Sequence, residues 1–450
     1  MMQLVLLALL ATAWEVSCLG KMDVIHSWKT PEFNFPSVEM KNAMLRTKAF
    51  IPENVAMIDV DVWEDFNKNQ QKIFVTMPRL QKGVPATLAT VGLTGALNPY
   101  PSWNWHQEGD CEGITSVFRV DIDQCGRLWV LDTGTVEVFS NAKRICPPQI
   151  LVFDLFTDRL LDRYRIPEDQ LESKSLLITI AVDARGPRCE DTFAYMADVV
   201  GYKIIVFDAQ TATSWRANNR YLYPYPTSSL FDINGVTFEL TDGVMGLALG
   251  PTNNYGDRKL YFHSFASHKE NWVPTSVLRN RTLLTAGDPK MEFRLLEGSR
   301  PSQAAAQAMT PSGILFFGLV TENSIACWNS RLSYTDDNII RVAKDKKTLQ
   351  FASGIKVRAG RVWTLTSRLQ NYIDGHVPMN ETNYRVVMGD LAQLTRGSKC
   401  YVLDNWTSGS SSSASSSSSM NGSNGSSSHS ESPYNKPSSG HYKPFIFKNR

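Results

Sequence analysis

The stretch "DIDQCGRLWVLDTG", Asp121–Gly134, contains two short strand-like segments on either side of a glycine. Apolar and β-branched side chains follow Gly126, a composition typical of a β-strand, and Gly126 suits the turn that precedes it. Asp121 and Asp123 come before this turn, and Asp132 lies near the end of the second strand. Carboxylates at turns and strand ends often accept backbone N–H bonds, but they also line active sites. The stretch is therefore either the edge of a site or one corner of a repeating sheet.

Segments of the same kind recur along the chain, each after a polar or glycine-containing turn and each with a partner strand upstream. They are "KIFVTMPR" from Lys72, "RLWVLDTG" from Arg127, "TFAYMADV" from Thr192, "KLYFHSFA" from Lys259, "ILFFGLVT" from Ile314 and "RVWTLTSR" from Arg361. A third strand is expected after most of them, including "TSVLRN" at 275–280. A small sheet cannot bury both of its faces alone, so these units predict an all-β fold, a six-bladed β-propeller.

The two ends of the chain differ in composition from the repeating part. Leu4–Trp14 is an apolar run too short to span a bilayer, and small residues follow it, so residues 1–20 are predicted to be a secretory signal peptide. The Ser-, Gly- and Asn-rich residues 407–450 are predicted to be a disordered C-terminal tail. Residues 21–406 then form the propeller domain, and we expect a secreted, extracellular protein.

Cysteines and sequons agree with a secretory route. Removal of the predicted signal peptide leaves an even set of cysteines, which indicates disulfides. We expect two bridges within a first cluster and a third bridge between the two remaining cysteines: the cluster is Cys111, Cys125, Cys146 and Cys189, and the third pair is Cys327 and Cys400. Which partners pair within the cluster stays open. The N-x-S/T sequons that mark glycan acceptors are at Asn280, Asn380, Asn405, Asn421 and Asn424.

Charge and motifs exclude several classes of function. The formal net charge is +2, with 46 basic and 44 acidic residues, so neither a nucleic-acid partner nor a membrane is expected. The chain has no G-x-S-x-G elbow, Walker loop, G-x-G-x-x-G or C-x2-C pair, so we expect no cofactor and no metal. One alternative stays open: a calcium-dependent lactonase-type propeller could gather Asp132, Asp198 and Asn323 on the axis.

Several longer motifs resemble those of the yellow / major royal jelly protein family of insects. They include "GDCEGITSVFRVDIDQCGRLWVLDTG", "CPPQILVFDL", "TDGVMGLALGP" and "NSIACWN", and the resemblance runs from about His26 to Trp406. It implies a secreted six-bladed propeller with a role in cuticle or eggshell pigmentation and melanin chemistry, or in nutrition and reproduction. Some members convert dopachrome, and related salivary proteins bind biogenic amines in the central channel. The fold does not decide among these functions.

A catecholic or indolic amine in the central cavity needs an aromatic wall, a carboxylate or carbonyl for its ammonium, and polar groups for its ring hydroxyls. We expect the inner strand ends to supply them. The candidates are Asp132, Thr133, Asp198, Ser264, Phe317, Thr321 and Asn323. Resemblance to the amine-binding relatives implies that residues 317–323 form the ligand wall.

Dopachrome conversion also needs a general base with a pKa near neutrality, for which histidine is suited. His263, in "YFHSF" on a predicted inner strand, is the first candidate, and His106 in "NWHQEGDC" is the second. The alternative for His263 is a core histidine bonded to a backbone carbonyl.

The leading hypothesis is a secreted yellow-like protein of the pigmentation pathway that binds or converts a catecholamine derivative such as dopachrome, in the second case as an isomerase. A non-catalytic extracellular structural or carrier protein, with partners in the extracellular matrix, is the alternative. The sequence leaves open whether any chemistry occurs.

Overall fold

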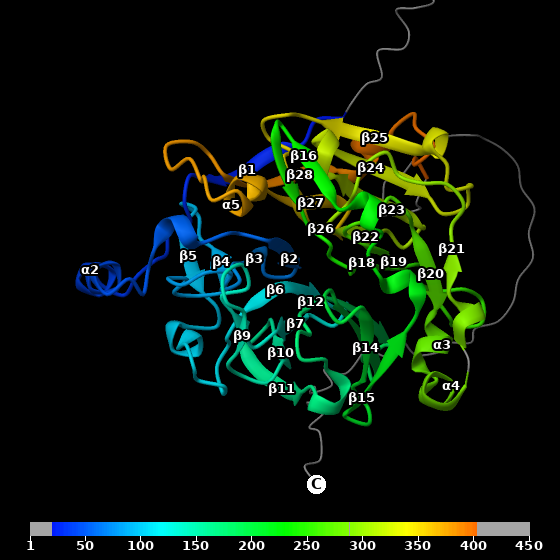
Figure 1. Ribbon diagram of the computed structural model, residues 1–450, viewed down its shortest axis with the longest axis horizontal. Helices are drawn as coiled ribbons and strands as arrows, with labels where there is room; N and C mark the ends of the chain where they lie inside the picture. The colour runs from blue at the N-terminus through cyan, green and yellow to red at the C-terminus, as the bar shows by residue number, and fades with distance from the viewer. Residues whose placement is uncertain (1–19, 288, 403–450) are drawn as a thin grey trace, which may run out of the picture.

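The computed structural model describes residues 20–287 and 289–402, and within them six four-stranded antiparallel sheets surround one axis (Figure 1). This confirms the predicted six-bladed β-propeller. The predicted tail and all but the last residue of the predicted signal peptide lie outside the described residues.

Five sheets are each built from consecutive segments of the chain and are ordered from the axis outward. The first is β2 (Asp59–Asp65), β3 (Gln70–Thr76), β4 (Leu88–Val91) and β5 (Leu97–Pro99). The second is β6 (Val117–Ile122), β7 (Arg127–Asp132), β10 (Gln149–Asp154) and β11 (Arg159–Arg165). The third is β12 (Leu177–Arg185), β13 (Asp191–Asp198), β14 (Lys203–Asp208) and β15 (Thr213–Asn218). The fourth is β18 (Val244–Leu249), β19 (Lys259–Ser264), β20 (Asn271–Pro274) and β21 (Arg294–Leu295). The fifth is β22 (Gln307–Met309), β23 (Ile314–Leu319), β24 (Ser324–Asn329) and β25 (Ile339–Lys344).

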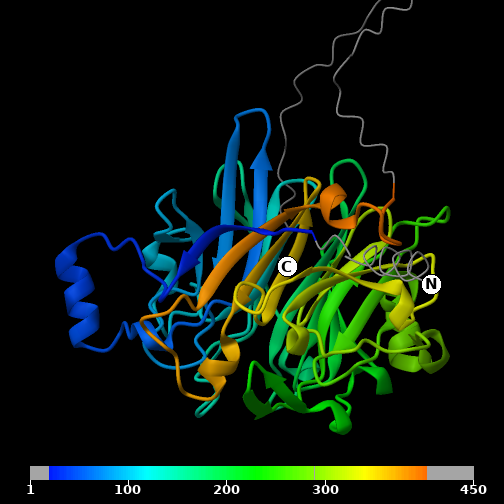
Figure 2. The ribbon, with the colours of Figure 1, turned by 90° about the horizontal axis from the view of Figure 1, so that it is seen from above.

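The sixth sheet closes the ring with strands from both ends of the described chain. Its order is β26 (Ala352–Arg358), β27 (Arg361–Ser367), β28 (Tyr384–Asp390) and then β1 (Asp23–Trp28). β1 pairs with β28 along its length, from Asp23 opposite Met388 to Trp28 opposite Tyr384. Figure 2 shows this blue N-terminal strand beside the orange strands of the C-terminal part. Trp28 Nε1 also donates to the Gly95 carbonyl at 2.7 Å, which ties the closing strand to the first sheet.

The six recurring segments of the sequence are the second strands of the sheets: β3, β7, β13, β19, β23 and β27. The prediction of a strand at "TSVLRN" is wrong, because Thr275–Arg279 is the helix α3 and β20 already ends at Pro274. Proline has no N–H for a continuing ladder, and its fixed φ suits the residue before a helix. α3 packs inward instead, and its Leu278 carbonyl accepts a bond from Trp215 Nε1 at 2.9 Å.

Each sheet is apolar on both faces because another sheet stacks on each. Between the second and third sheets, for example, the buried side chains are Trp129, Leu131, Ile150, Val152, Ile180, Met196, Ile205 and Phe207. The remaining elements lie in loops or outside the ring. They are two small hairpins, β8 (Thr135–Val136) with β9 (Lys143–Arg144) and β16 (Leu230–Ile233) with β17 (Val236–Glu239), and the helices α2 (Val38–Arg46), α4 (Arg281–Ala286), α5 (Leu369–Ile373) and α6 (Leu391–Thr395). Among the described helices, none has the length and apolar character needed to cross a membrane.

The stretch Asp121–Gly134 is the corner between β6 and β7. Gly126 has φ +72°, a left-handed conformation that glycine adopts without strain. Asp123 organises the turn: its Oδ1 accepts the Cys125 and Arg127 N–H groups at 2.9 and 3.1 Å. Asp123 thus has a structural role at this strand–turn–strand corner.

Three disulfides join the six predicted cysteines, and they include the predicted Cys327–Cys400 pair. Within the first cluster, the bridges are Cys111–Cys146 and Cys125–Cys189. The second of these joins the β6–β7 turn to the loop between β12 and β13, so it links neighbouring sheets. Cys400 lies beyond α6 and holds the end of the described chain against β24.

Replacing Cys327 and Cys400 together by serine should lower the free energy of unfolding by about 4 kcal/mol. The bridge closes a sequence separation of 73 residues, and its loss returns that loop's entropy to the unfolded chain. Guanidinium denaturation of the oxidised wild type and the double variant measures the difference. A loss below about 1 kcal/mol would contradict the assigned role of the bridge.

Candidate functional site in the axial channel

The innermost strands form the wall of a channel with a cavity at each end. β2, β6, β12, β18, β22 and β26 lie nearest the axis (Figure 1) and contact one another in sequence round the ring. The starts of β2, β6, β12, β18 and β26 line a cavity of about 250 Å³. The ends of β6, β12, β18 and β26, together with β22, line a second cavity of about 670 Å³. The four strands that line both cavities, β6, β12, β18 and β26, therefore run in the same direction along the axis, and we call the two spaces the small and the large cavity.

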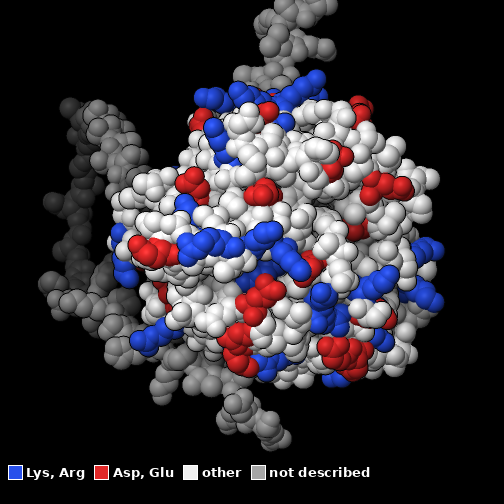
Figure 3. Space-filling model, turned by 60° about the vertical axis from the view of Figure 1, so that its left-hand side comes forward, with Lys and Arg blue, Asp and Glu red and all other residues white. Residues whose placement is uncertain are grey.

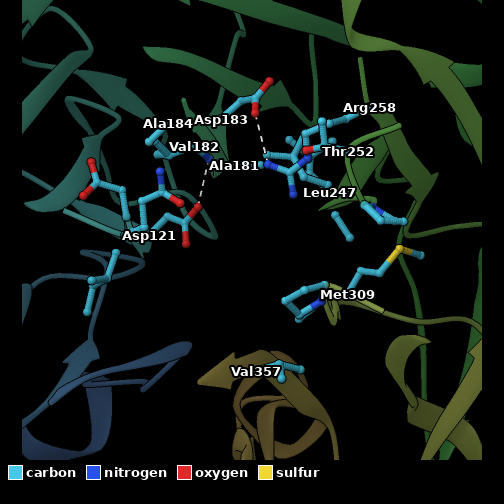
Figure 4. Close-up of a pocket in the computed structure, with 18 of the residues that line it drawn as sticks. Asp121, Ala181, Val182, Asp183, Ala184, Leu247, Thr252, Arg258, Met309 and Val357 are labelled. Carbon is cyan, nitrogen blue, oxygen red and sulfur yellow. Dashed lines mark hydrogen bonds and ion pairs between the residues drawn. The ribbon is translucent and has the colours of Figure 1, made fainter. Parts of the chain in front are cut away.

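The large cavity has charged walls whose charges are already paired. Asp183 lies 3.0 Å from Arg258 and 2.6 Å from Arg185. Arg358 donates to Asp61 and Asp121, both at 2.7 Å. Figure 4 shows the contact of Asp183 with Arg258 and that of Asp121 with Val182. A charged ligand would have to compete with these built-in pairs, so the larger volume is not the better site.

The small cavity is mostly apolar and has an aromatic wall. Phe118 comes from β6, Phe265 follows β19, Phe351 precedes β26, and Leu, Ile, Val and Met side chains fill the rest of the lining. Phe139, which is 43% exposed, lies on the same lining. Among these residues stand two charged side chains, Arg119 and Asp242. A flat aromatic ligand with polar substituents suits such a lining.

Asp242 precedes β18 and presents its carboxyl group to the small cavity. The Asp242 side chain is partly buried, and the resulting loss of hydration raises its pKa to about 7. In the described part of the chain, the carboxylate has no hydrogen-bond partner; only the Asp242 backbone carbonyl accepts a bond, from Ala266. A carboxylate in this state can accept a proton or an ammonium near neutral pH.

Arg119 crosses the channel from β6 and is only 5% exposed. Its Nη1 donates to Thr179 Oγ1 at 3.2 Å on β12, and its Nη2 donates to the Ser353 carbonyl at 2.8 Å on β26. Nε has no partner. Burial lowers the pKa of Arg119, partly offset by the charge of Asp59. The guanidinium thus lines the small cavity while held by neutral acceptors.

The ligand residues predicted from the sequence lie elsewhere. Their expected location is at the ends of inner strands, and this location is wrong, because β7, β13, β19 and β23 are the second strands of their sheets. None of the predicted ligand residues lines either axial cavity: Asp132, Thr133, Asp198, Ser264, Phe317, Thr321 and Asn323. Strand periodicity identifies a strand but not its distance from the axis, which depends on how the sheets stack.

Three of these residues bond to backbone groups, and two of them, Asp132 and Asp198, hold the residues just before inner strands. Asp132 accepts the backbone N–H groups of Thr115 and Ser116 at 2.8 and 2.7 Å. Asp198 accepts the Leu176 N–H at 2.8 Å, and Ser264 Oγ donates to the Tyr223 carbonyl at 2.8 Å. Thr133, next to Asp132, is buried as well.

The segment 317–323, expected as the ligand wall, joins the fifth sheet to its surroundings. Phe317 is fully buried on β23. Thr321 Oγ1 donates to Ser302 Oγ at 2.9 Å, and Asn323 Nδ2 donates to Asn234 Oδ1 at 3.0 Å in the β16–β17 turn.

His263 occupies a buried network between the fourth and fifth sheets. It lies on β19, and its Nε2 is 2.9 Å from the Ala304 carbonyl while its Nδ1 is 3.0 Å from Glu270. Glu270 also pairs with Arg300 at 2.6 Å. Burial lowers the pKa of His263, and the positive charge of Arg300 lowers it further. This placement matches the core-histidine alternative, and His263 has no access to either axial cavity.

His106, the second candidate base, is also buried away from both cavities. Its Nε2 is 3.0 Å from the Tyr100 carbonyl, and its Nδ1 accepts the Thr87 N–H at 3.4 Å. Burial lowers the pKa of His106 to about 3. The imidazole is therefore neutral at physiological pH.

The three residues considered for calcium do not meet. Asp132 and Asp198 belong to the second and third sheets and Asn323 follows a strand of the fifth, each with its own partners. In residues 20–287 and 289–402, no three His, Cys, Asp or Glu side chains gather as metal ligands.

The sequons Asn280 and Asn380 are exposed. Asn280 also begins α4, where its Oδ1 accepts the Leu283 N–H at 3.0 Å. Asn405, Asn421 and Asn424 lie outside the described residues. Figure 3 shows acidic and basic side chains interspersed on one face, in keeping with the near-balanced charge.

A closed ring of six sheets with an apolar, partly charged cavity at one end of its axis defines the class: a six-bladed β-propeller with an axial cavity. The model of the major royal jelly protein family matches residues 115–400. Protein yellow of Drosophila melanogaster is 33% identical over 411 residues, covering 89% of this chain and 74% of that protein. Protein yellow of Drosophila subobscura is 34% identical over 396 residues, covering 86% and 68%. The chain belongs to the major royal jelly protein family.

A solved structure gives a weaker likeness. Catalytically inactive virginiamycin B lyase from Staphylococcus aureus with quinupristin aligns with a TM-score of 0.39 and 12% identity, covering 75% of this chain and 96% of that one. A likeness at this level says nothing about the function of this chain.

The buried His106 should make an increasingly destabilising contribution as the pH drops below about 6.5. The pKa of His106 is about 3 in the folded protein against a reference of 6.5, so the unfolded chain takes up the proton first. Between these values the contribution is about 1.4 kcal/mol per pH unit, or about 2 kcal/mol from pH 6.5 to 5. Denaturation at several pH values should give a shallower dependence for His106→Gln than for the wild type. Parallel curves would refute this assignment.

Proposed function

We propose that this is a secreted, yellow-like protein of cuticle or eggshell pigmentation that binds a catecholamine derivative in the small cavity. The observation that carries the proposal is the unpartnered Asp242 carboxylate within an aromatic-lined space of about 250 Å³. The relatives named Protein yellow support the pigmentation role, and the three disulfides support an oxidising, extracellular location.

The lining suits the parts of a catecholamine. The ring would lie against Phe118, Phe265 or Phe351, and its ammonium would meet the ionised Asp242. A buried carboxylate that gains a cation recovers the free energy lost on desolvation. The ligand ammonium therefore supplies the cationic partner that Asp242 lacks in the protein alone.

Conversion of dopachrome would use the same carboxylate as a base. The isomerisation moves two protons, one from each saturated ring carbon, to the two quinone oxygens, so that no oxidant or reductant is consumed. A general base works best when its pKa lies near the working pH, and the pKa of Asp242 is about 7. Asp242 thus replaces His263 and His106 as the candidate base.

The carrier hypothesis has its own support. The small cavity offers Asp242 as a base, but in the described part of the chain its only other charged lining residue is Arg119, which does not release protons near neutrality. Because the cavity has a base but no general acid to protonate the quinone oxygens, its lining is as consistent with binding as with catalysis.

Asp242→Asn should weaken dopamine binding by at least about tenfold, because it removes the ammonium's partner. Wild-type affinity should rise as the pH increases through about 7, where Asp242 ionises, and the variant should lose that dependence. Calorimetry between pH 6 and 8 measures both effects. Asp23→Asn, which changes an exposed carboxylate on β1, is the matched control. Equal affinities for wild type and Asp242→Asn would refute the site.

The rate of dopachrome decay distinguishes the enzyme hypothesis from the carrier hypothesis. Decay accelerated by the wild type but not by Asp242→Asn would establish conversion with Asp242 as the base. Decay identical with and without protein, together with measurable dopamine binding, would establish the carrier function. Failure of both ligands to bind would remove the small cavity as the site.

A further inference from the structure

Arg119 lacks the carboxylate partner that a buried guanidinium normally has. No carboxylate oxygen lies within 4.0 Å of its nitrogen atoms in the described residues. Burial lowers the pKa of Arg119 and the charge of Asp59 raises it in part, but the Asp59 carboxylate accepts the Val120 N–H at 3.2 Å and lies 3.8 Å from Lys356. Arg300 shows the usual arrangement, fully buried and 2.6 Å from Glu270. Desolvated charges are stable when they are paired, so Arg119 is an incomplete ion pair.

The free donors of Arg119 suit a carboxylate. A guanidinium has five N–H donors in a planar fork. Among the described residues, only two of these donors have acceptors, the Thr179 hydroxyl and the Ser353 carbonyl, and both acceptors are neutral. Nε–H is buried and has no acceptor. Arginine binds carboxylates by two parallel hydrogen bonds more strongly than it binds neutral acceptors.

The small cavity therefore holds one unpaired cation and one unpaired anion. Arg119 lies within the inner strand β6, whereas Asp242 precedes the inner strand β18, so the two charges approach the cavity from different sheets. A simple amine would satisfy Asp242 but would bring a second positive charge into the cavity with Arg119. A ligand with both a carboxylate and an amino group would satisfy both charges.

We propose that the small cavity selects catechols or indoles that carry a carboxylate, that is, aromatic amino acids and their derivatives, over the corresponding decarboxylated amines. Arg119 binds the ligand carboxylate, and Asp242 binds the ligand nitrogen. Arg119 is then a specificity-determining residue. This inference rests on the proposed function insofar as both place the ligand in the small cavity.

Calorimetry with two matched ligand pairs tests the selection: L-DOPA against dopamine, and L-tryptophan against tryptamine. The wild type should bind the carboxylated member of each pair at least about tenfold more tightly, the size expected for one charge-assisted bidentate contact. Arg119→Met should abolish the preference, and Arg119→Lys, which keeps the charge but loses the fork, should retain only part of it. Arg331→Met changes an exposed arginine and should leave the preference unchanged.

The outcomes separate this inference from the proposed function. Dopamine binding as tight as L-DOPA binding in the wild type overturns the selection and leaves the proposed function standing. An unchanged preference in Arg119→Met overturns the role of Arg119. Absence of binding by all four ligands overturns both proposals. The wild-type ratio needs no variant, so it tests the selection even if Arg119→Met fails to fold; thermal melting of each variant identifies that case.

Discussion

Closure of the ring is the constraint on which the rest of the structure depends. Each sheet is apolar on both faces, so it is stable only between two neighbours, and an open stack would leave its two outermost faces exposed. Pairing of β1 with β28 removes this problem by building the sixth sheet from both ends of the described chain. Trp28 then extends the contact to the first sheet. The axis, and both cavities on it, exist only in the closed form.

Polar residues at the ends of the second strands set the positions of the inner strands. Asp132 holds the backbone of Thr115 and Ser116, just before β6, and Asp198 holds Leu176, just before β12. Arg119 follows Ser116 closely on β6. The residues first expected to bind a ligand therefore support the strand that carries a cavity charge, although they do not touch the cavity themselves.

The distribution of paired charges distinguishes the two ends of the channel. At the large cavity, the carboxylates of Asp61, Asp121 and Asp183 neutralise the arginines around them, which stabilises the ring without a ligand. At the small cavity, Arg119 and Asp242 remain unpaired within an apolar lining. Leaving charges in that state costs stability, and the loss is recovered when a ligand of matching charge binds. The smaller space is therefore the better candidate site.

The sequence alone determined the ring. Strand-like segments after glycine-containing turns identified all six sheets, and the even set of cysteines indicated the disulfides, because strand and turn propensities are local properties. It failed at "TSVLRN", where Pro274 ends a strand and a helix begins. Only the tertiary structure decided which strand of each sheet faces the axis, and so placed Asp242 and Arg119 in the cavity and His263 in the core. Which strand lies at the axis depends on how whole sheets stack on one another, and the periodicity of residues along one strand does not contain that information.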